Sequence, residues 1–266
     1  MSFQLFSDVH TELKPGKFPK IPQTEDYLIL AGDIGKISLI NFRDFITYCS
    51  GKWKKVFFVF GNHEFYINRS IEHLKSQYKE FFDTFTNVFL LDSEYVIVDN
   101  IAIYGFIGWT KPIYSIASEA LSSGLNDYKH ICTKKGKLTP KYVNEMVTDE
   151  RTKFKKFIDD VNSGEIDCNA VMVITHFPPI KEGTSDPIYI TTDNHLNPYF
   201  SWENYIETND IRCEKLRVWV SGHTHWCYDF EKTFSEDMNV RFVGNQVGYT
   251  FEHTDFTNCS ISLVFP

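Results

Sequence analysis

The sequence lacks the cysteine spacing of a disulfide scaffold or of a thiolate zinc site. Its six cysteines contain no CxxC pair, and isolated thiols are typical of a reducing compartment. The opening stretch MSFQLFSDVH has neither the basic nor the apolar region of a signal peptide, and no apolar run is long enough to span a membrane. We therefore expect a cytoplasmic protein without a membrane partner.

The sequence also has little positive charge. Its 27 lysines and arginines are outnumbered by 35 aspartates and glutamates, which gives a formal net charge of −8 and a pI near 5.6. Proteins that bind long nucleic acids carry a basic footprint, and this chain as a whole has none. The basic stretches at 134–137 and 153–156 are short, and we interpret them as solvated faces of a loop or helix. The charge therefore argues against long nucleic acid as a partner, and it predicts no oligomeric state.

What the sequence does contain is apolar surface to bury. Of its 266 residues, 42% are hydrophobic and 16% are aromatic, which is enough for a substantial core. No internal repeat or low-complexity segment divides the chain. We therefore expect a single domain over residues 1–266.

Continuous apolar runs, typical of strands buried on both faces, alternate with helical periodicity in the first half of the chain. We expect strands at 3–7, 26–34, 55–60, 169–176 and 216–225, helices at 37–50, 69–86 and 139–163, a hairpin turning at Asp99 and Asn100, and closing strands at 228–234, 240–246 and 260–265. This order predicts an α/β sandwich, in which two packed sheets carry helices on their outer faces. Residues 110–138 are too long and irregular for a plain connection, and we interpret them as a lid or substrate-binding insertion.

Polar residues follow five of the expected strands. In chain order they are Asp8-Val9-His10, Gly32-Asp33, Gly61-Asn62-His63-Glu64, His176 and Gly222-His223-Thr224-His225. Because the carboxyl ends of strands in an α/β sheet gather along one edge, we expect these side chains to meet there. The glycines before Asp33, Asn62 and His223 are expected to let the backbone turn sharply.

The motifs differ in how much each says alone. Asp-x-His and Gly-Asp are ordinary at strand ends and turns, and a lone His176 is typical of a buried, hydrogen-bonded histidine. Gly-Asn-His-Glu and Gly-His-Thr-His are more specific, because no turn requires them. The five in this order indicate a site. The other histidines, for which we expect surface or packing roles, are His73, His130, His195 and His253.

The donor types of these motifs indicate a metal site. Asp8 and His10 are two residues apart and project the same way on an extended chain, as do His223 and His225. Oxygen and imidazole donors without thiolate suit Mn, Fe, Zn or Ni. The seven donors are too many for one ion and enough for two, if one carboxylate bridges them.

Together the motifs resemble the signature of the calcineurin-like metallophosphoesterases, over residues 8 to 225 and with no motif degenerate. The resemblance implies a four-layer α/β/β/α sandwich with a centre of two divalent or trivalent transition metal ions, Mn or Fe ahead of Zn and Ni. It implies that one ion takes Asp8, His10, Asp33 and His225, and that the other takes Asp33, Asn62, His176 and His223. Asp33 would bridge the two.

Departures from the family pattern narrow the resemblance. The second motif reads GDIGK and lacks the arginine of the Gly-Asp-x-Val-Asp-Arg-Gly version found in Ser/Thr protein phosphatases. The stretches LILAGDIG, GNHEFY, GFIGWT and LNDY look closer to a group of small, mostly uncharacterised bacterial and viral metallophosphoesterases.

For such a centre we expect hydrolysis of a phosphate ester by a hydroxide that bridges the two ions. His63 would protonate the leaving group as general acid, since it follows the neutral ligand Asn62 in the chain. Glu64 would hold the His63 imidazole in orientation, or else be a carboxylate at the start of a helix. The substrate that we favour is a small phosphodiester or a nucleotide.

Three alternatives use the same fold: a nuclease of the DNA-repair type, a phosphomonoesterase or protein phosphatase, and a non-catalytic interaction scaffold such as a retromer subunit. The acidic balance argues against the nuclease, and the complete donor set argues against the scaffold. Substrate selectivity would lie in residues 110–138 and 178–200. Candidate contacts are Trp109, Asn126, Asp127 and Tyr128; each could equally be structural, and a structural role is favoured for Trp109.

Overall fold

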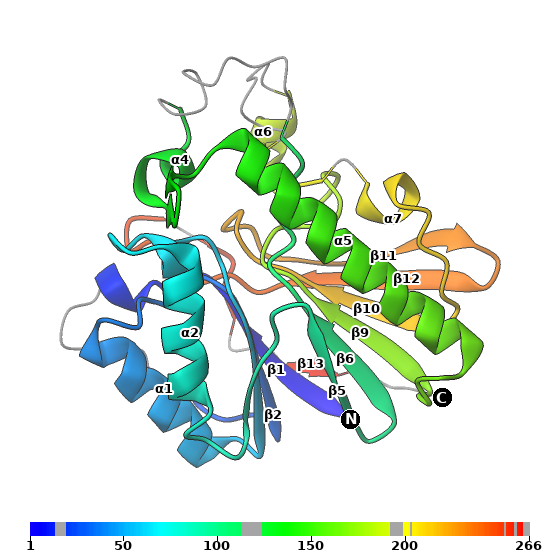
Figure 1. Cartoon of the computed structure of the whole chain (residues 1–266). Coiled ribbons are helices and arrows are strands. Elements are labelled where there is room, and N and C mark those ends of the chain that lie inside the picture. The colour runs from blue at the N-terminus through cyan, green and yellow to red at the C-terminus, as the bar shows by residue number, and fades with distance from the viewer. Residues whose placement is uncertain are drawn as a thin grey trace.

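The protein, seen here in a computed structural model, is a sandwich of two β-sheets with helices on both outer faces (Figure 1). The structure describes residues 1–13, 20–112, 124–191, 199–202, 204–252, 254–257 and 260–262. The predicted α/β sandwich is confirmed. Helices α1 (Ile40–Lys52) and α2 (Ile71–Phe82) cover one sheet, and α5 (Pro140–Ser163) covers the other.

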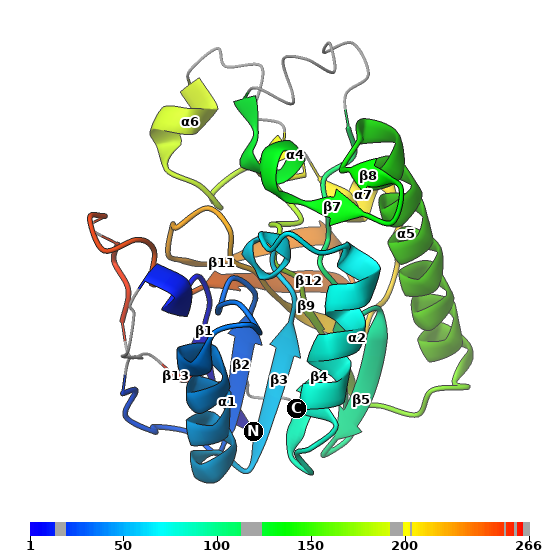
Figure 2. The ribbon, with the colours of Figure 1, turned by 60° about the vertical axis from the view of Figure 1, so that its left-hand side comes forward.

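The first sheet has the strand order β13-β1-β2-β3-β4. Its strands are β1 (Ser2–Phe6), β2 (Tyr27–Ala31), β3 (Lys55–Val59), β4 (Val88–Leu90) and β13 (Ser260–Ser262). The strands from β1 to β4 are mutually parallel, and β13 pairs antiparallel with β1 at the edge. The parallel register sends the carboxyl ends of β1, β2 and β3 to the same edge of the sheet, as the arrows of β2 and β3 show in Figure 2.

The second sheet has the strand order β11-β12-β10-β9-β6-β5. Its strands are β5 (Glu94–Val98), β6 (Ile101–Gly105), β9 (Ala170–Ile174), β10 (Leu216–Val220), β11 (Tyr228–Ser235) and β12 (Met238–Gly244). The four central strands run parallel, and β5 and β11 pair antiparallel at the edges. The predicted hairpin joins β5 to β6 through Asp99 and Asn100, both with positive φ, as a tight two-residue turn requires.

Alternating side chains divide each central strand between two cores. Inward-facing residues of both sheets pack together as one cluster: Phe3, Leu5, Ile29, Ala31, Phe57, Val59, Ile101, Ile103, Met172, Ile174, Val218 and Val220. The residues between them face the helices instead. The ring centroid of Phe58 lies 4.8 Å from that of Phe82 of α2, and the ring centroid of Trp219 lies 5.6 Å from that of Phe154 of α5. Burial on both faces explains why the sequence shows continuous apolar runs rather than alternation.

The long helix α5 begins and ends as the sequence predicts. The Thr139 side chain accepts a hydrogen bond from the Tyr142 amide, Pro140 occupies the first helical position, and Gly164 ends the helix in the left-handed conformation (φ 82°). The sequence pattern does not predict strand β4, because three residues are too few to show a periodic signal.

The remaining elements are short and lie near the carboxyl ends of the strands or at the surface. They are η1 (Thr11–Leu13), η2 (His63–Phe65), α4 (Asn126–His130), β7 (Cys132–Thr133), β8 (Gly136–Lys137), α6 (Pro187–Thr191) and α7 (Tyr205–Thr208). The expected insertion at 110–138 thus contains α4, β7 and β8, while 113–123 lie outside the described residues. Within the described part of the chain, no helix combines the length and apolarity needed to cross a membrane.

Candidate metal centre

The polar residues that follow the strands of both sheets meet at one place. Asp8 and His10 follow β1, Asp33 follows β2, and Asn62 follows β3 in the first sheet. From the second sheet, His176 follows β9, and His223 and His225 follow β10. An unbroken series of contacts between side-chain atoms connects all seven predicted donors. The structure therefore brings these seven side chains into one cluster.

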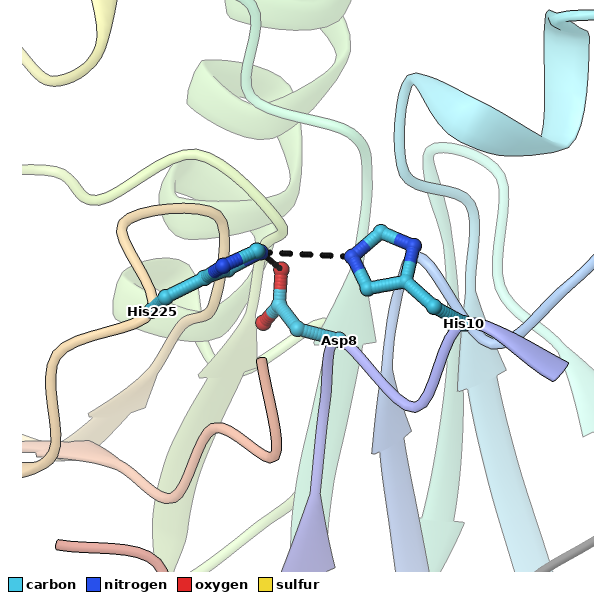
Figure 3. Close-up of side chains that lie close together, drawn as sticks. All are labelled: Asp8, His10 and His225. Carbon is cyan, nitrogen blue, oxygen red and sulfur yellow. Dashed lines mark hydrogen bonds and ion pairs between the residues drawn. The ribbon is translucent and has the colours of Figure 1, made fainter. Parts of the chain in front are cut away.

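The first group of donors consists of Asp8, His10 and His225 (Figure 3). The Nε2 atoms of His10 and His225 face each other at 3.2 Å, and Nε2 of His225 lies 3.4 Å from Oδ1 of Asp8. Two imidazole nitrogens and a carboxylate oxygen thus converge on a common point. The three residues come from the two different sheets, so that only sheet packing brings them together.

The second group of donors surrounds Nε2 of His176. This atom lies 3.0 Å from Oδ1 of Asn62, 3.2 Å from Nδ1 of His223 and 3.5 Å from Oδ1 of Asp33. Nδ1 of His176 lies 3.0 Å from the carbonyl oxygen of Ala31, which fixes the ring with Nε2 toward the other donors.

Asp33 lies between the two groups. Its Oδ1 faces His176, whereas its Oδ2 is 3.9 Å from Nε2 of His10. One carboxylate therefore presents an oxygen to each group, as a bridging ligand must. Oδ1 also accepts a hydrogen bond of 2.8 Å from the backbone amide of His63, which holds the carboxylate in place.

The backbone is contorted at these donors. The φ angles of Asp8, His10, Asp33, His223 and His225 are 54°, 48°, 53°, 76° and 53°, in the left-handed region that non-glycine residues seldom adopt. Loop hydrogen bonds hold this conformation: the amides of Asp8 and His10 donate to the carbonyl oxygens of Gly32 and Asp33, both at 3.0 Å. Backbone strain that the surrounding structure maintains is a feature of functional sites.

The three motif glycines serve two purposes. Only Gly32 has a positive φ (83°), so the predicted sharp turn applies to it alone among the three. A Cβ on Gly61 would lie 2.2 Å from Oδ1 of Asp33, and one on Gly222 would lie 2.7 Å from Oδ2 of Asp8. These two glycines leave room for the donor carboxylates.

Replacing Gly61 with alanine is therefore expected to damage the site. The new methyl group would also lie 2.5 Å from the backbone nitrogen of Asp33, so the loop has to move. We expect a loss of about 1–3 kcal/mol in the free energy of unfolding, typical of overpacking, and weaker Mn²⁺ binding. Urea unfolding and metal titration would measure both. Gly51→Ala is the matched control, because a Cβ there meets nothing within 4 Å; unchanged Mn²⁺ binding in Gly61→Ala would contradict the expectation.

The electrostatics of the cluster favour added positive charge. Burial raises the pKa of Asp33, but the charges of His176, His63 and His10 together hold that pKa well below its usual range. Burial lowers the pKa of His176, and the charge of Asp33 and its hydrogen bond outweigh this and raise the pKa to about 10. Burial and the neighbouring His176 lower the pKa of His223 to about 3. In the metal-free protein the Asp33 carboxylate thus stays ionised and His176 retains a proton, which a bound cation would displace, whereas His223 is neutral.

His63 lies at the rim of the cluster. Its Nδ1 is 3.2 Å from Oε1 of Glu12, its Nε2 is 3.9 Å from Oδ2 of Asp33, and its ring stacks on Tyr66 at 4.3 Å. Burial lowers the pKa of His63, but the charge of Asp33 and the contact with Glu12 raise it above its usual value. The same oxygen of Glu12 lies 3.0 Å from Nδ1 of His10. Glu12 therefore orients both imidazoles.

Glu64 has a different environment from the one that its place beside His63 suggested. Its carboxylate is buried and accepts hydrogen bonds from four backbone amides, those of Asp33 (3.0 Å), Ile34 (2.7 Å), Gly35 (3.1 Å) and Gly61 (2.7 Å). The carboxylate on the His63 ring is that of Glu12. Glu64 therefore does not orient His63; it lies in the first turn of η2, as the alternative of a carboxylate at a helix start predicts, and it ties the two donor loops together by their backbones.

Further contacts to the cluster come from segments that gave no sequence signal. Oε2 of Glu252 lies 2.5 Å from Nδ1 of His225, and the hydroxyl of Tyr249 lies 3.3 Å from Nε2 of His63. Burial lowers the pKa of His225, but Asp8 and Glu252 raise it to about 9. No motif marks residues 249–252. Glu12, in contrast, continues the alternate spacing of Asp8 and His10, and this spacing is a sequence signal that Glu12 lies at the site.

A cavity of about 300 Å³ opens over the cluster. Its lining includes donors of both groups, together with His63, Lys181 and several aromatic side chains: Tyr66, Tyr189, Tyr199, Phe200 and Tyr249. Of the candidate substrate contacts, Asn126 and Asp127 line this cavity. Trp109 and Tyr128 are buried in the core instead, which confirms the structural reading favoured for Trp109.

The donor set fits a pair of transition metal ions. In the described part of the chain, three groups of acidic and histidine side chains could hold an ion, and all three draw on Asp8, His10, Asp33, His63, His176 and His225. Imidazole and carboxylate donors that converge on shared points, with further oxygen and nitrogen from Asn62 and His223, suit such ions.

Comparison with known proteins agrees with this chemistry. A family model described as calcineurin-like phosphoesterase matches residues 1–227. An uncharacterised protein from Acanthamoeba polyphaga mimivirus is 30% identical over 253 residues, which are 90% of this chain and 84% of that protein.

Two solved structures share the fold. Phosphopantetheinyl hydrolase from Mycobacterium tuberculosis superposes with a TM-score of 0.60 at 16% identity, covering 93% of this chain and 89% of its own. A dimetal phosphatase from Danio rerio superposes with a TM-score of 0.53 at 12% identity, covering 92% of this chain and 86% of its own. At such identities the likeness concerns the fold alone.

Proposed function

The chain belongs to the calcineurin-like phosphoesterase family and is a metal-dependent phosphoric ester hydrolase, and we propose that it uses two ions to hydrolyse a small phosphodiester or a nucleotide. The observation that carries the proposal is the position of Asp33, whose two oxygens face two separate groups of donors. A single carboxylate placed in this way would serve two ions at once.

The proposed ligands of one ion are Asp8, His10, Asp33 and His225, and those of the other are Asp33, Asn62, His176 and His223. Mn or Fe suits these oxygen and imidazole donors, with Zn and Ni as alternatives. When bound, the ions supply Lewis-acid activation of the phosphate group and of a water molecule. Only two of the proposed ligands, Asp8 and Asp33, are carboxylates, so the ligands themselves leave the charge of two ions incompletely neutralised, which favours binding of a phosphate ester.

His63 is the proposed general acid. Its ring reaches the cavity, it lies next to the proposed ligand Asn62, and Glu12 holds its Nδ1. This leaves Nε2, near Asp33 and the Tyr249 hydroxyl, as the atom that donates a proton to the departing oxygen. Stacking on Tyr66 keeps the ring plane fixed during the transfer.

The cavity supports a small substrate with a planar or apolar part. Its volume of about 300 Å³ is at the lower end of the range for small-molecule sites. Lys181 is available to a phosphate, and the rings of Tyr189 and Phe200 offer stacking surfaces.

Five cysteines in the described residues are free of disulfides, which supports a cytoplasmic location.

A substrate panel tests the proposal. The protein is reconstituted with Mn²⁺, Fe²⁺, Ni²⁺ and Zn²⁺ in turn and assayed with aryl phosphodiesters, cyclic nucleotides, mononucleotides and a labelled oligonucleotide. We expect kcat/KM for a small diester or nucleotide to exceed that for the oligonucleotide by at least about tenfold, or ~1.4 kcal/mol. Chelator-treated protein is the control. Preference for the oligonucleotide, or no hydrolysis by protein that holds two ions, would contradict the proposal.

A further inference from the structure

The side-chain amide of the proposed metal ligand Asn62 is hydrogen-bonded on the side that faces away from His176. Its Oδ1 faces His176 at 3.0 Å, while its Nδ2 donates hydrogen bonds to Oδ1 of Asp127 at 2.8 Å and to the hydroxyl of Tyr66 at 3.1 Å. The Tyr66 hydroxyl in turn donates to the same oxygen of Asp127 at 2.5 Å. Asn62, Tyr66 and Asp127 thus form a closed triangle of hydrogen bonds behind the donor cluster.

The Asp127 carboxylate determines which way the amide points. A carboxylate accepts hydrogen bonds and donates none when ionised, so it pairs with the NH₂ end of Asn62 and repels the oxygen end. The oxygen is then left facing Nε2 of His176, which also lies 3.5 Å from Oδ1 of Asp33, and the proposed ion would bind among these donors. A negative charge beside the NH₂ group also polarises the amide and makes its oxygen a stronger donor.

Asp127 reaches this position from outside the strand ends. It lies on α4, which stands beyond the carboxyl ends of the strands in Figure 2. The helix is anchored by three buried neighbours of Asp127, namely Leu125, Tyr128 and Ile131. The carboxylate is therefore on a fixed support, and it lines the same cavity as the donors.

We propose that Asp127 is a positioning residue that orients the Asn62 amide toward one ion of the centre, an inference that rests on the two-ion site proposed above. Tyr66 supports this arrangement, because its hydroxyl donates a hydrogen bond to Asp127 while its ring stacks on His63. The insertion thus controls a metal ligand directly and the general acid through Tyr66.

Metal titration of three variants tests the inference. In Asp127→Ala the amide loses its acceptor, and we expect one of the two Mn²⁺ ions to bind about 10–100-fold more weakly while the other keeps its affinity. Asp127→Asn keeps an acceptor oxygen without the charge and should show a smaller loss at the same ion. Tyr66→Phe should cause the smallest loss of affinity for that ion. Calorimetry with Mn²⁺ and the visible spectrum of the Co²⁺-loaded protein report this difference without a substrate.

Lys129→Ala, an exposed change on the same helix, is the control and should bind both ions as the wild type does. Unchanged affinity for both ions in Asp127→Ala overturns the inference. If Asp127→Ala lowers the affinity for both ions equally, the Asp127→Asn variant decides between the two interpretations. An equal loss of affinity for both ions in Asp127→Asn overturns the inference as well. Because affinity is measured without hydrolysis, a selective loss supports the role of Asp127 even if the substrate panel is negative.

Discussion

Replacing Asp33 with asparagine is expected to abolish both metal binding and turnover. The amide supplies one neutral oxygen where the carboxylate presents one charged oxygen to each donor group. Metal activation of a phosphate ester contributes several kcal/mol, so we expect kcat/KM to fall on the order of 10³-fold or more. Steady-state kinetics and the metal content of purified protein measure the two losses.

A thermal readout separates loss of the site from loss of the fold. Ions that bind only the native state stabilise it, by about 2.7 kcal/mol at a hundredfold excess over Kd, so Mn²⁺ should raise the Tm of the wild type. Asp33→Asn should lose this increase yet remain folded, because its Oδ1 can still accept from the His63 amide. Asp149→Asn, on the exposed face of α5, is the control. A variant that still binds two ions with wild-type affinity would exclude Asp33 as the bridging ligand.

Replacing His63 with alanine is expected to separate metal binding from catalysis. None of the proposed ligands is removed, so the protein should retain its ions. General acid catalysis contributes roughly 10²–10⁴-fold, and this should be lost for alkyl esters, whose leaving oxygen needs a proton. A p-nitrophenyl ester leaves readily as its anion and should lose much less. The measurement is kcat for both esters with Mn²⁺-loaded protein.

His73→Ala is the matched control for this experiment, because His73 is exposed on α2 and outside the cavity. It should hydrolyse both esters as the wild type does. Equal losses for the two esters in His63→Ala would assign His63 a role in holding the site together rather than in donating a proton.

The location of the site could be predicted from the sequence because strand burial and strand ends are both local signals. Runs such as residues 55–60 read as buried strands, and the change from apolar to polar at Gly61 and at Gly222 marks where each strand ends. In parallel sheets those ends share an edge by topology alone. The seven donors therefore came together as the sequence indicated, without any knowledge of distances.

The partners of the donors could not be predicted, because they depend on how distant segments pack. Glu64 directly follows His63 in the chain, yet its carboxyl group turns inward to four backbone amides, because a buried polar group needs hydrogen-bond partners. The position beside His63 is taken by Glu12, 51 residues earlier in the chain. Adjacency in sequence did not determine which carboxylate meets which imidazole.

The fold class, the strand ends and the set of donor atoms follow from local apolar patterning and residue chemistry, so they can be predicted from the amino-acid sequence. The division of the donors into two groups, the orientation of the Asn62 amide and the lining of the cavity depend instead on how distant segments pack. Asp33 faces donors from both sheets, and Asp127 reaches Asn62 across 65 positions of the chain. Such contacts arise when two sheets and an insertion pack together, and no local pattern encodes them.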